Sequence, residues 1–394
     1  MQNPPYDVLI VGAGVFGAAS ALELQARGYR VGVVDPGPLP HPLAASTDIS
    51  KVVRMEYGAD EQYMAMAEAS LDGWRRWNDQ WDEPLFHEPG VTMVTHTPMQ
   101  PGGFEYESYH MALKRGHHPD RLDADEIVRR FPQWKSGAYV DGYYNREGGY
   151  AESGRVVAKL AELGQAAGVT YHVGYTVDTI LEADGRVIGV QARDGSRFEA
   201  DQVIVCAGTW THVLLPELAP VMKSSGHPVF HLKPANPEAF QPPHFVVFFA
   251  DTSATGWYGF PLHPHNGVVK IANHGIGQIM HPENDARVVT PQDEANLRTM
   301  LADTFPALVD APVVYTRRCL YCDTRDEHFW IDRHPQRPGL TVAAGGSGHA
   351  FKFAPILGSL IADAMEAKPN QWLPKFCWRT LESMQGQEAS RHHA

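Results

Sequence analysis

The chain has 394 residues, 43% of them hydrophobic, and a formal net charge of −13. At roughly 100–200 residues per domain, this length predicts two or three domains with buried cores. The acidic balance and the lack of a polybasic run argue against nucleic acid or an anionic membrane as a partner. Four cysteines are too few for a secreted fold stapled by disulfides.

The first residues predict neither a signal peptide nor a membrane anchor. Residues 1–6 carry no positive charge. The apolar run Val8–Leu22 is shorter than the ~20 residues that a membrane span needs, and three glycines interrupt it. We therefore expect a cytoplasmic protein without a membrane partner.

A dinucleotide-binding pattern begins at once. Asp7–Val11 is a short apolar run, typical of a strand buried on both faces of a parallel sheet. Ala18–Arg27 predicts a helix, which a glycine ends, and Val31–Val34 predicts a second strand. The intervening Gly12-Ala13-Gly14-Val15-Phe16-Gly17 fits G-x-G-x-x-G, and Asp35 ends the second strand. Strand, glycine turn and helix are the context in which this motif binds a dinucleotide.

Each part of the motif has a physical role. Gly12 permits the tight turn, Gly14 lets the backbone approach the pyrophosphate, and Gly17 allows the helix to pack closely on the strand. The helix N-terminus offers N–H groups and a partial positive charge to the phosphates. Asp35 can accept hydrogen bonds from the ribose and disfavours the extra phosphate of NADP. The motif alone does not decide between FAD and NAD.

The next stretches alternate between regular and loop-rich. Glu61–Trp81 predicts a helix whose apolar stripe we interpret as core packing rather than a cofactor platform. Residues 85–145 are rich in Pro, Gly, His and aromatics with little helical period, and residues 215–325 are similar. Ser153 is expected to cap a helix over Gly154–Ala167. Short strand-like runs are Val169–Val173, Arg186–Val190, Gln202–Cys206, Phe245–Phe249 and Val268–Ile271.

Two later features favour FAD. Val203–Trp210 is an apolar strand that ends in the small-residue turn Ala207-Gly208, as in flavoproteins whose chain passes beneath the cofactor. Leu340–Lys352 is a second strand that feeds the glycine-rich turn Gly345–His349. A helix that starts there would direct N–H dipoles at the flavin N1/C2=O edge, where negative charge develops on reduction.

The nucleotide-binding pattern thus occurs in three separate pieces. We predict an α/β protein with a discontinuous, Rossmann-like FAD-binding domain made of residues 1–85, 146–214 and 326–394. A substrate-binding domain of mixed, mostly antiparallel β-structure, residues 86–145 and 215–325, is expected to be inserted in two stretches.

From the first strand to about Lys368, the sequence resembles the monomeric sarcosine oxidase family, which includes N-methyltryptophan oxidase and the fructosyl amino acid oxidases. The most specific stretches are Cys319–Asp332, which reads CLYCDTRDEHFWID, and Ser347–Phe353, which reads SGHAFKF. The resemblance implies a fold like that of D-amino-acid oxidase, a monomer, and FAD attached covalently through a cysteine thioether.

By this resemblance Cys319 is the attachment cysteine, and Cys322 is an extra that the family does not require. A Cys-x-x-Cys pair can also be a redox disulfide or half of a zinc site. A disulfide reductase usually carries its pair soon after the first fingerprint, and a zinc site needs two more ligands at similar spacing. Neither condition is met, and no metal is predicted.

The resemblance also assigns catalytic and substrate-binding side chains. Lys270 matches a lysine over the flavin, where a fixed cation would stabilise the charge that develops as oxygen is reduced. His274 matches a histidine near the substrate. Arg54 and Lys352 match the residues that bind the substrate carboxylate, for which the planar guanidinium is well suited. Tyr258 and Tyr321 match tyrosines that line the pocket.

One departure concerns the substrate. Sarcosine oxidases have an arginine where this chain has Lys51, which is also placed in the substrate site. Lys51, together with the tail Lys375–Arg379, looks more like the fructosyl amino acid oxidases, and the loop Val221–His231 departs from the sarcosine oxidase pattern. The predicted cofactor-binding residues are Gly12, Gly14, Val15, Phe16, Gly17, Asp35, Val177, Ala207, Gly208, Cys319, Gly346, Gly348, His349 and Lys352.

The predicted function is oxidation of the C–N bond of a secondary amine or N-substituted amino acid, with FAD as cofactor and oxygen as electron acceptor. The products would be an imine, which hydrolyses, and hydrogen peroxide. Three alternatives stay open: a dehydrogenase that uses another acceptor, a pyridine-nucleotide enzyme, and a flavin-binding redox sensor without activity. A second glycine fingerprint, which a pyridine-nucleotide enzyme would need, is not found.

Overall fold

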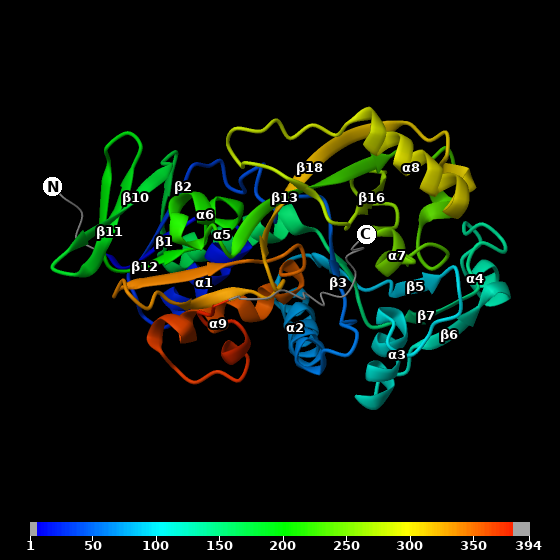
Figure 1. The fold of residues 1–394 in the computed structure, drawn as a ribbon, viewed down its shortest axis with the longest axis horizontal. Helices are drawn as coiled ribbons and strands as arrows, with labels where there is room; N and C mark the ends of the chain where they lie inside the picture. Colours follow the sequence, from blue (N-terminus) through cyan, green and yellow to red (C-terminus); the bar gives the residue numbers. More distant parts are fainter. Residues whose placement is uncertain (1–5, 381–394) are drawn as a thin grey trace. The chain divides into compact units, whose positions relative to one another are not determined.

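The computed structural model describes residues 6–380 (Figure 1). The described chain divides into two compact units. The first unit contains residues 6–49, 152–224 and 320–380, and the second contains residues 50–151 and 225–319. Two long strands, β13 (Met222–Leu232) and β18 (Val313–Thr324), begin in one unit and end in the other.

A sheet of eight strands forms the centre of the first unit. Its main path, in spatial order, is β10 (Val177–Ala183), β11 (Arg186–Ala192), β12 (Arg197–Val205), β1 (Tyr6–Val11), β2 (Val31–Asp35) and β9 (Thr170–Val173). β20 (Leu340–Ala344) runs parallel to β12, and β19 (Trp330–Arg333) pairs antiparallel with β20. β1, β2, β9 and the end of β12 are also parallel. β1, β2, β20 and the end of β12 are buried on both faces, so these segments are nearly continuous apolar runs, whereas the edge strand β9 is partly exposed.

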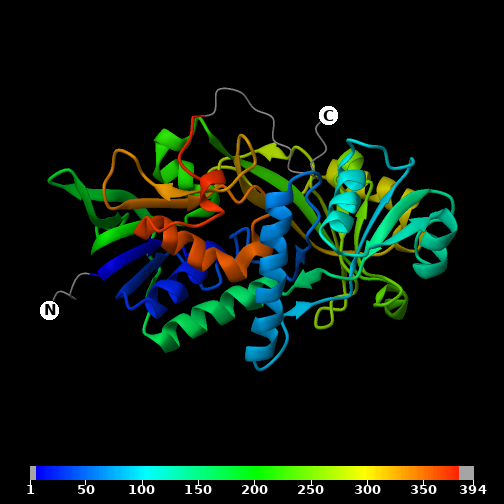
Figure 2. The ribbon, with the colours of Figure 1, turned by 90° about the horizontal axis from the view of Figure 1, so that it is seen from below.

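Three helices of the first unit pack together. α1 (Val15–Ala26) lies between α5 (Ser153–Ala167) and α9 (Ala354–Glu366), and Figure 2 shows the three side by side. The predicted Rossmann-like arrangement of β1, glycine turn, α1 and β2 is confirmed. A four-residue helix, α6 (Thr211–Leu214), follows β12.

The second unit is built on a nine-stranded sheet. Its path is β17 (Gln278–Ile279), β13, β16 (Val269–Asn273), β15 (Trp257–Gly259), β14 (Val247–Ala250), β5 (Val91–Thr95), β7 (Asp141–Asn145) and β6 (Asp120–Asp123), with β18 paired to β13. β14 and β5 are parallel, whereas β13–β16, β13–β17, β14–β15, β15–β16, β5–β7 and β6–β7 are antiparallel pairs, so the sheet is mostly antiparallel as predicted. A small sheet is formed by β3 (Lys51–Val53), β8 (Gly149–Ala151) and β4 (Phe86–His87).

The two faces of the nine-stranded sheet bury different side chains. On β14, Phe248 joins one core cluster, whereas Val247 and Phe249 join another. On β16, Val269 and Ile271 join the first cluster. Successive side chains of a strand point to opposite faces, so the residue between Val269 and Ile271, Lys270, is directed to the other face.

Most helices of the second unit were not predicted from the sequence. α2 (Glu61–Gln80) was expected, but α3 (Phe104–Lys114), α4 (Ala124–Arg130), α8 (Pro291–Thr304) and the short α7 (Thr252–Thr255) lie in stretches predicted to be loop-rich. For α8 a local signal existed, because Thr290 and Asp293 form a capping box and Pro291 occupies the first turn. α3 begins without a side-chain cap, so no capping signal indicated a helix in this stretch rich in Pro, Gly and aromatic residues.

Two further details differ from expectation. Ser153 is the first residue of α5 rather than its cap, and its hydroxyl donates to the Asp48 carbonyl at 2.9 Å. Residues 50–85, which the sequence grouped with the cofactor domain, lie in the second unit, because β3 pairs with β8. No helix within residues 6–380 is both long and apolar enough to cross a membrane.

Candidate functional site

The glycine loop of the first unit has the close backbone contacts that the fingerprint predicts. Gly12 has a positive φ of 99°, and a Cβ there would lie 2.6 Å from the Cys206 carbonyl oxygen. A Cβ on Gly17 would lie 1.9 Å from the Gly12 carbonyl oxygen. Neither position has room for a side chain. The first turn of α1 itself carries no acidic side chain, so its N–H groups suit an anionic phosphate.

Two side chains hold this loop in shape. Asp35 is buried, and its carboxylate oxygens accept hydrogen bonds from Ala13 N at 2.8 Å and Gly37 N at 2.7 Å. A carboxylate oxygen has two lone pairs, so Asp35 can still accept a ribose hydroxyl. The Ser46 hydroxyl accepts a 3.3 Å hydrogen bond from Val15 N at the start of α1. Ser46 was missed, since only the fold brings it to the loop.

The second glycine turn follows β20. Ser347 has a positive φ of 44°, unusual for a residue with a Cβ, and its N–H donates to the Cys322 carbonyl at 2.9 Å. His349 Nε2 lies 2.9 Å from the Glu327 carbonyl oxygen, and Lys352 Nζ donates to the His349 carbonyl at 3.0 Å. His349 and Lys352 are both buried. This turn therefore presents a constrained backbone and a buried ammonium.

The two glycine turns belong to one region of the first unit. A Cβ on Gly346 would lie 3.6 Å from the Phe16 ring, so the second turn reaches the start of α1. The Cys206–Ala207 backbone lies against Gly12. Gly348 is exposed on the second turn.

Two other residues that the sequence assigned to the site have different surroundings. Val177 packs against the core cluster that contains Val11, Val34 and Val205. The carbonyl oxygen of Tyr321 accepts a hydrogen bond from the Thr209 hydroxyl at 3.4 Å.

In the second unit, Lys270 is a buried cation. Its side chain is 1% exposed, and Nζ donates to the Ser50 carbonyl at 2.5 Å and lies 4.8 Å from the centroid of the Phe260 ring. Burying a charged ammonium costs free energy unless hydrogen bonds and aromatic faces compensate for the lost water. A fold that keeps this cation buried is typical of a site where the charge has a function.

Arg54 lies in an aromatic box on the same unit. Its guanidinium carbon is 5.1 Å from the Phe249 ring centroid, 5.2 Å from that of Tyr57 and 5.8 Å from that of Phe104. Tyr258 stacks on Phe249 with centroids 5.8 Å apart. The rings hold Arg54, which is only 3% exposed, in a fixed orientation with little water around it. Such a guanidinium suits a bidentate carboxylate.

His274 extends this cluster. Its ring lies edge-on to Tyr258 at 6.4 Å and tilted to His227 at 6.0 Å. His227 is itself buried, and its Nε2 is 2.9 Å from the Ser225 hydroxyl. Tyr258 also contacts Phe260, the ring beneath Lys270, at 5.9 Å. The second unit thus brings Lys270, His274, Tyr258 and Arg54, from three segments of the sequence, together through Phe249 and Phe260.

Cys319 has cationic neighbours. Lys51 Nζ lies 3.9 Å from Cys319 Sγ. Burial lowers the pKa of Arg287, whose charge also interacts with Cys319. Positive neighbours stabilise a thiolate, the form in which cysteine is a nucleophile. Arg287 was not identified from the sequence, because nothing local connects it to Cys319.

The neighbouring thiol of Cys322 has a different environment. Cys319 and Cys322 occupy positions i and i+3 of β18, so they face opposite sides of the strand and their Cα atoms are about 10 Å apart. A disulfide requires about 7 Å or less. Burial raises the pKa of Cys322 to about 12. The interpretations as a redox disulfide or half of a zinc site are therefore wrong, and among the described residues no group of three His, Cys, Asp or Glu side chains could hold a metal ion.

A family model described as FAD dependent oxidoreductase matches residues 7–364. The chain belongs to this family. Members of this FAD-dependent oxidoreductase family require a site for FAD, and the residues present fit one: close backbone contacts at Gly12 and Gly17 fix the glycine loop at the start of α1, and Asp35 provides a carboxylate acceptor beside it.

Relatives within the family span nearly the whole chain. L-saccharopine oxidase of Schizosaccharomyces pombe is 27% identical over 408 residues, which cover 94% of this chain and 93% of that protein. N-methyl-L-tryptophan oxidase of Escherichia coli is 29% identical over 377 residues, covering 93% of this chain and 96% of that protein. The crystal structure of Amadoriase I, a fructosyl amine:oxygen oxidoreductase from Aspergillus fumigatus, superposes with a TM-score of 0.81 at 26% identity and covers 96% of this chain and 90% of that one.

Proposed function

We propose that this FAD-dependent oxidoreductase oxidises a secondary amine or N-substituted amino acid and transfers the electrons to oxygen. The observation that carries the proposal is the group of buried cations and aromatic rings around Lys270 and Arg54 in the second unit. Relatives named as oxidases of saccharopine, N-methyltryptophan and fructosyl amines support the same class of substrate.

Arg54 and Lys352 are proposed to bind the substrate carboxylate. The aromatic box fixes the Arg54 fork before substrate arrives, so little conformational entropy is lost on binding. The ammonium of Lys352 is proposed to add a point charge. The rings of Tyr258 and Phe249 offer an apolar surface to the rest of the substrate.

His274 and Tyr258 are proposed to position the amine nitrogen. The amine must be neutral, because its lone pair drives the loss of the electron pair from the neighbouring carbon. Cations around the site lower the amine's pKa and favour the neutral form. When bound, FAD accepts two electrons from that carbon and delivers them to oxygen. Lys270 stabilises the negative charge that develops on oxygen as it is reduced to hydrogen peroxide.

Cys319 is proposed to hold FAD through a thioether to the flavin 8-methyl carbon. Lys51 lies 3.9 Å from the Cys319 sulfur, and the charge of Arg287 also interacts with this cysteine. One S–H and one C–H hydrogen are lost with two electrons when the bond forms, and oxygen takes them up as hydrogen peroxide. We also propose that the enzyme is a cytoplasmic monomer, for which sedimentation of the purified protein tests the oligomeric state.

The test of the proposed reaction is peroxide release with a panel of amines. Sarcosine, other N-alkyl amino acids, cyclic imino acids and fructosyl amino acids are the candidates, and their primary-amine counterparts are the controls. We expect release with at least one N-substituted amino acid, with oxygen consumed in equal amount. Flavin bleaching without oxygen uptake would identify a dehydrogenase. A flavin that no amine bleaches would identify a redox sensor and end the proposal.

The covalent bond is tested separately. After denaturation in acid, the yellow colour should remain with the precipitated protein, and Cys319→Ala should release it to the supernatant. Cys322→Ala is the matched control, because Cys322 lies on the same strand but faces the other side. Colour released from the wild-type protein would contradict covalent attachment without affecting the proposed reaction.

A further inference from the structure

The end of the described chain is fastened to the turn between β18 and β19 by one arginine. Arg379 donates Nε and Nη2 to the two carboxylate oxygens of Asp326 at 2.6 and 2.7 Å. Nη1 and Nη2 also donate to the carbonyls of Phe329 and His328, each at 3.2 Å. The guanidinium carbon lies 4.4 Å from the centroid of the Trp330 ring. Few surface arginines combine a bidentate pair, carbonyl acceptors and an aromatic face.

Neighbouring residues of the tail strengthen this attachment. Ile331 N donates to the Phe376 carbonyl at 2.9 Å, and Trp378 N donates to the Asp332 carboxylate at 2.7 Å. Trp378 also packs edge-on against Trp330, with centroids 5.4 Å apart. The segment Phe376–Arg379 thus forms a continuous clamp on β19 and the turn before it, and we call this segment the tail clamp.

The clamped turn supports the second glycine turn of the cofactor region. Its Glu327 carbonyl oxygen contacts His349 Nε2, and its Thr324 N–H donates to the Ser347 hydroxyl at 3.2 Å. Glu327 and Ser347 both have positive φ values, 61° and 44°. Non-glycine residues keep such conformations only where the surrounding structure holds them.

Phe329 connects the same parts through its ring. It packs against Phe376 of the tail clamp at 4.9 Å, stacks on His349 at 4.9 Å, and meets Phe16 at the start of α1 edge-on at 6.3 Å. Phe329 is fully buried. A displacement of the tail would therefore shift both glycine turns, because close-packed interiors transmit strain.

We infer that Arg379 is a positioning residue for the cofactor: by clamping the turn at Asp326, it fixes the backbone of Gly345–Lys352 in the orientation that directs N–H dipoles and the Lys352 ammonium toward bound FAD. The charge of Arg379 is neutralised by Asp326, so it acts through geometry rather than through its own field. The inference rests on FAD binding, which family membership establishes, and not on the proposed amine substrate.

The test measures the electrostatic field at the flavin in the purified holoenzyme. Sulfite adds to oxidised flavin as an anion, so its dissociation constant reports positive potential around the ring without amine turnover. Arg379→Ala should weaken sulfite binding about fivefold, the effect of a misdirected helix-terminal dipole, or should lower the ratio of flavin to protein. Arg379→Lys keeps the charge but loses the bidentate fork and should give an intermediate result.

Arg27→Ala is the matched control. Arg27 also forms a multiple ion pair in the first unit, with Glu23, Asp363 and Glu366, but its partners lie on α1 and α9 rather than on the clamped turn. It should lower thermal stability without changing sulfite affinity or flavin content. If Arg379→Ala behaves like Arg27→Ala in all three measurements, the tail clamp is merely structural and the inference is wrong.

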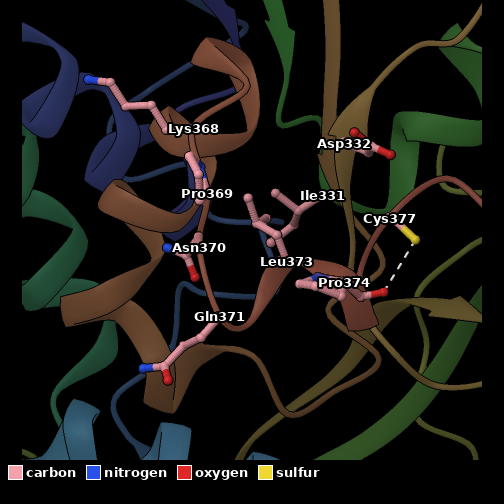
Figure 3. A pocket seen from close by; sticks show the side chains of 9 residues that line it. All are labelled: Ile331, Asp332, Lys368, Pro369, Asn370, Gln371, Leu373, Pro374 and Cys377. Atoms are coloured by element: carbon pink, nitrogen blue, oxygen red, sulfur yellow. Dashed lines mark hydrogen bonds between the residues drawn. The ribbon is translucent and has the colours of Figure 1, made fainter.

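Cys377 provides a second measurement. It is partly exposed beside a pocket of about 510 Å³, and its thiol donates to the Pro374 carbonyl at 3.2 Å (Figure 3). Cys206, Cys319 and Cys322 are buried. Arg379→Ala should therefore accelerate the reaction of one thiol with an aromatic disulfide reagent several-fold, while Arg27→Ala should not. An unchanged rate in Arg379→Ala would show that Arg379 does not hold the tail, and would overturn the inference.

Discussion

The two units each contain a candidate region, and these regions are built from different materials. In the first unit the cofactor region is mostly backbone: positions where a Cβ would collide, N–H groups at a helix start, and carbonyls that hold Ser347 and His349. The candidate region of the second unit consists of side chains, namely buried cations set among aromatic rings. A backbone site depends on local spacing, whereas a side-chain site depends on strands far apart in the sequence.

This difference predicts how each region fails. The backbone site should fail completely when a single methyl group is added, because the obstructing atoms cannot move aside. The side-chain site should lose one function at a time, because each cation has its own task. Four substitutions test this contrast, from the largest expected effect to the smallest.

Gly17→Ala should abolish FAD binding. Its Cβ would lie 1.9 Å from the Gly12 carbonyl oxygen, which is backbone and part of the glycine loop. Gly28→Ala, just after the other end of α1, is the matched control, since no atom lies within 4 Å of its Cβ and only its positive φ of 93° is strained. The ratio of flavin to protein absorbance measures both. Full flavin content in Gly17→Ala would mean that the loop is not rigid.

Lys270→Met should slow reoxidation of the reduced enzyme by oxygen about 10²–10³-fold, the usual cost of removing one preorganised electrostatic group. Flavin reduction by the amine should change much less, because Lys270 acts on oxygen. Stopped-flow absorbance separates the two half-reactions. Lys270→Arg keeps the charge and should recover part of the rate. Equal slowing of both half-reactions would show a general packing defect.

Arg54→Met should raise KM for a carboxylate substrate about 10–100-fold, because a charge-assisted hydrogen-bonded pair is lost. Arg54→Lys should recover little, since an ammonium cannot reproduce the planar fork. The control is a substrate analogue with an amide in place of the carboxylate. If both substrates lose affinity equally in Arg54→Met, Arg54 supports the pocket rather than the carboxylate.

The smallest effect concerns the pH dependence of folding in the second unit. Burial lowers the pKa of His117, but hydrogen bonds to Glu147 at 2.8 Å and Glu68 at 3.0 Å raise it above the model-peptide value of 6.5 on balance. A raised pKa in the folded state means that His117 stabilises the protein below pH 6.5, and that this contribution is lost as pH rises through the folded pKa.

His117→Gln should therefore lower the free energy of unfolding by about 1 kcal/mol in mildly acidic buffer, the size of a partly exposed ion pair. At alkaline pH the substitution should have little effect. Chemical denaturation at several pH values measures the difference. A loss that is the same at every pH would contradict the ion-pair interpretation.

The sequence predicted the motif region of the first unit better than the helices of the second unit. β1, β2 and Asp35 were predicted to within one residue, because the motif fixes their spacing along the chain, whereas α1 begins three residues before the predicted helix. α3 and α4 were missed in a stretch rich in turn-forming residues, where tertiary packing decides the secondary structure. The catalytic and substrate-binding residues rested on family resemblance. The structure of the second unit groups four of them around Phe249 and Phe260, but their roles remain predictions.

By itself the sequence determined the class of cofactor and the discontinuous α/β fold, because glycine spacing, apolar runs and strand alternation act over a few neighbouring residues. Only the tertiary structure decided that Arg54 would be enclosed by Phe104 and Phe249, and that Arg379 would clamp Asp326. These partners are separated by tens to hundreds of residues. No local pattern encodes such contacts, because they form only when distant segments are packed into one core.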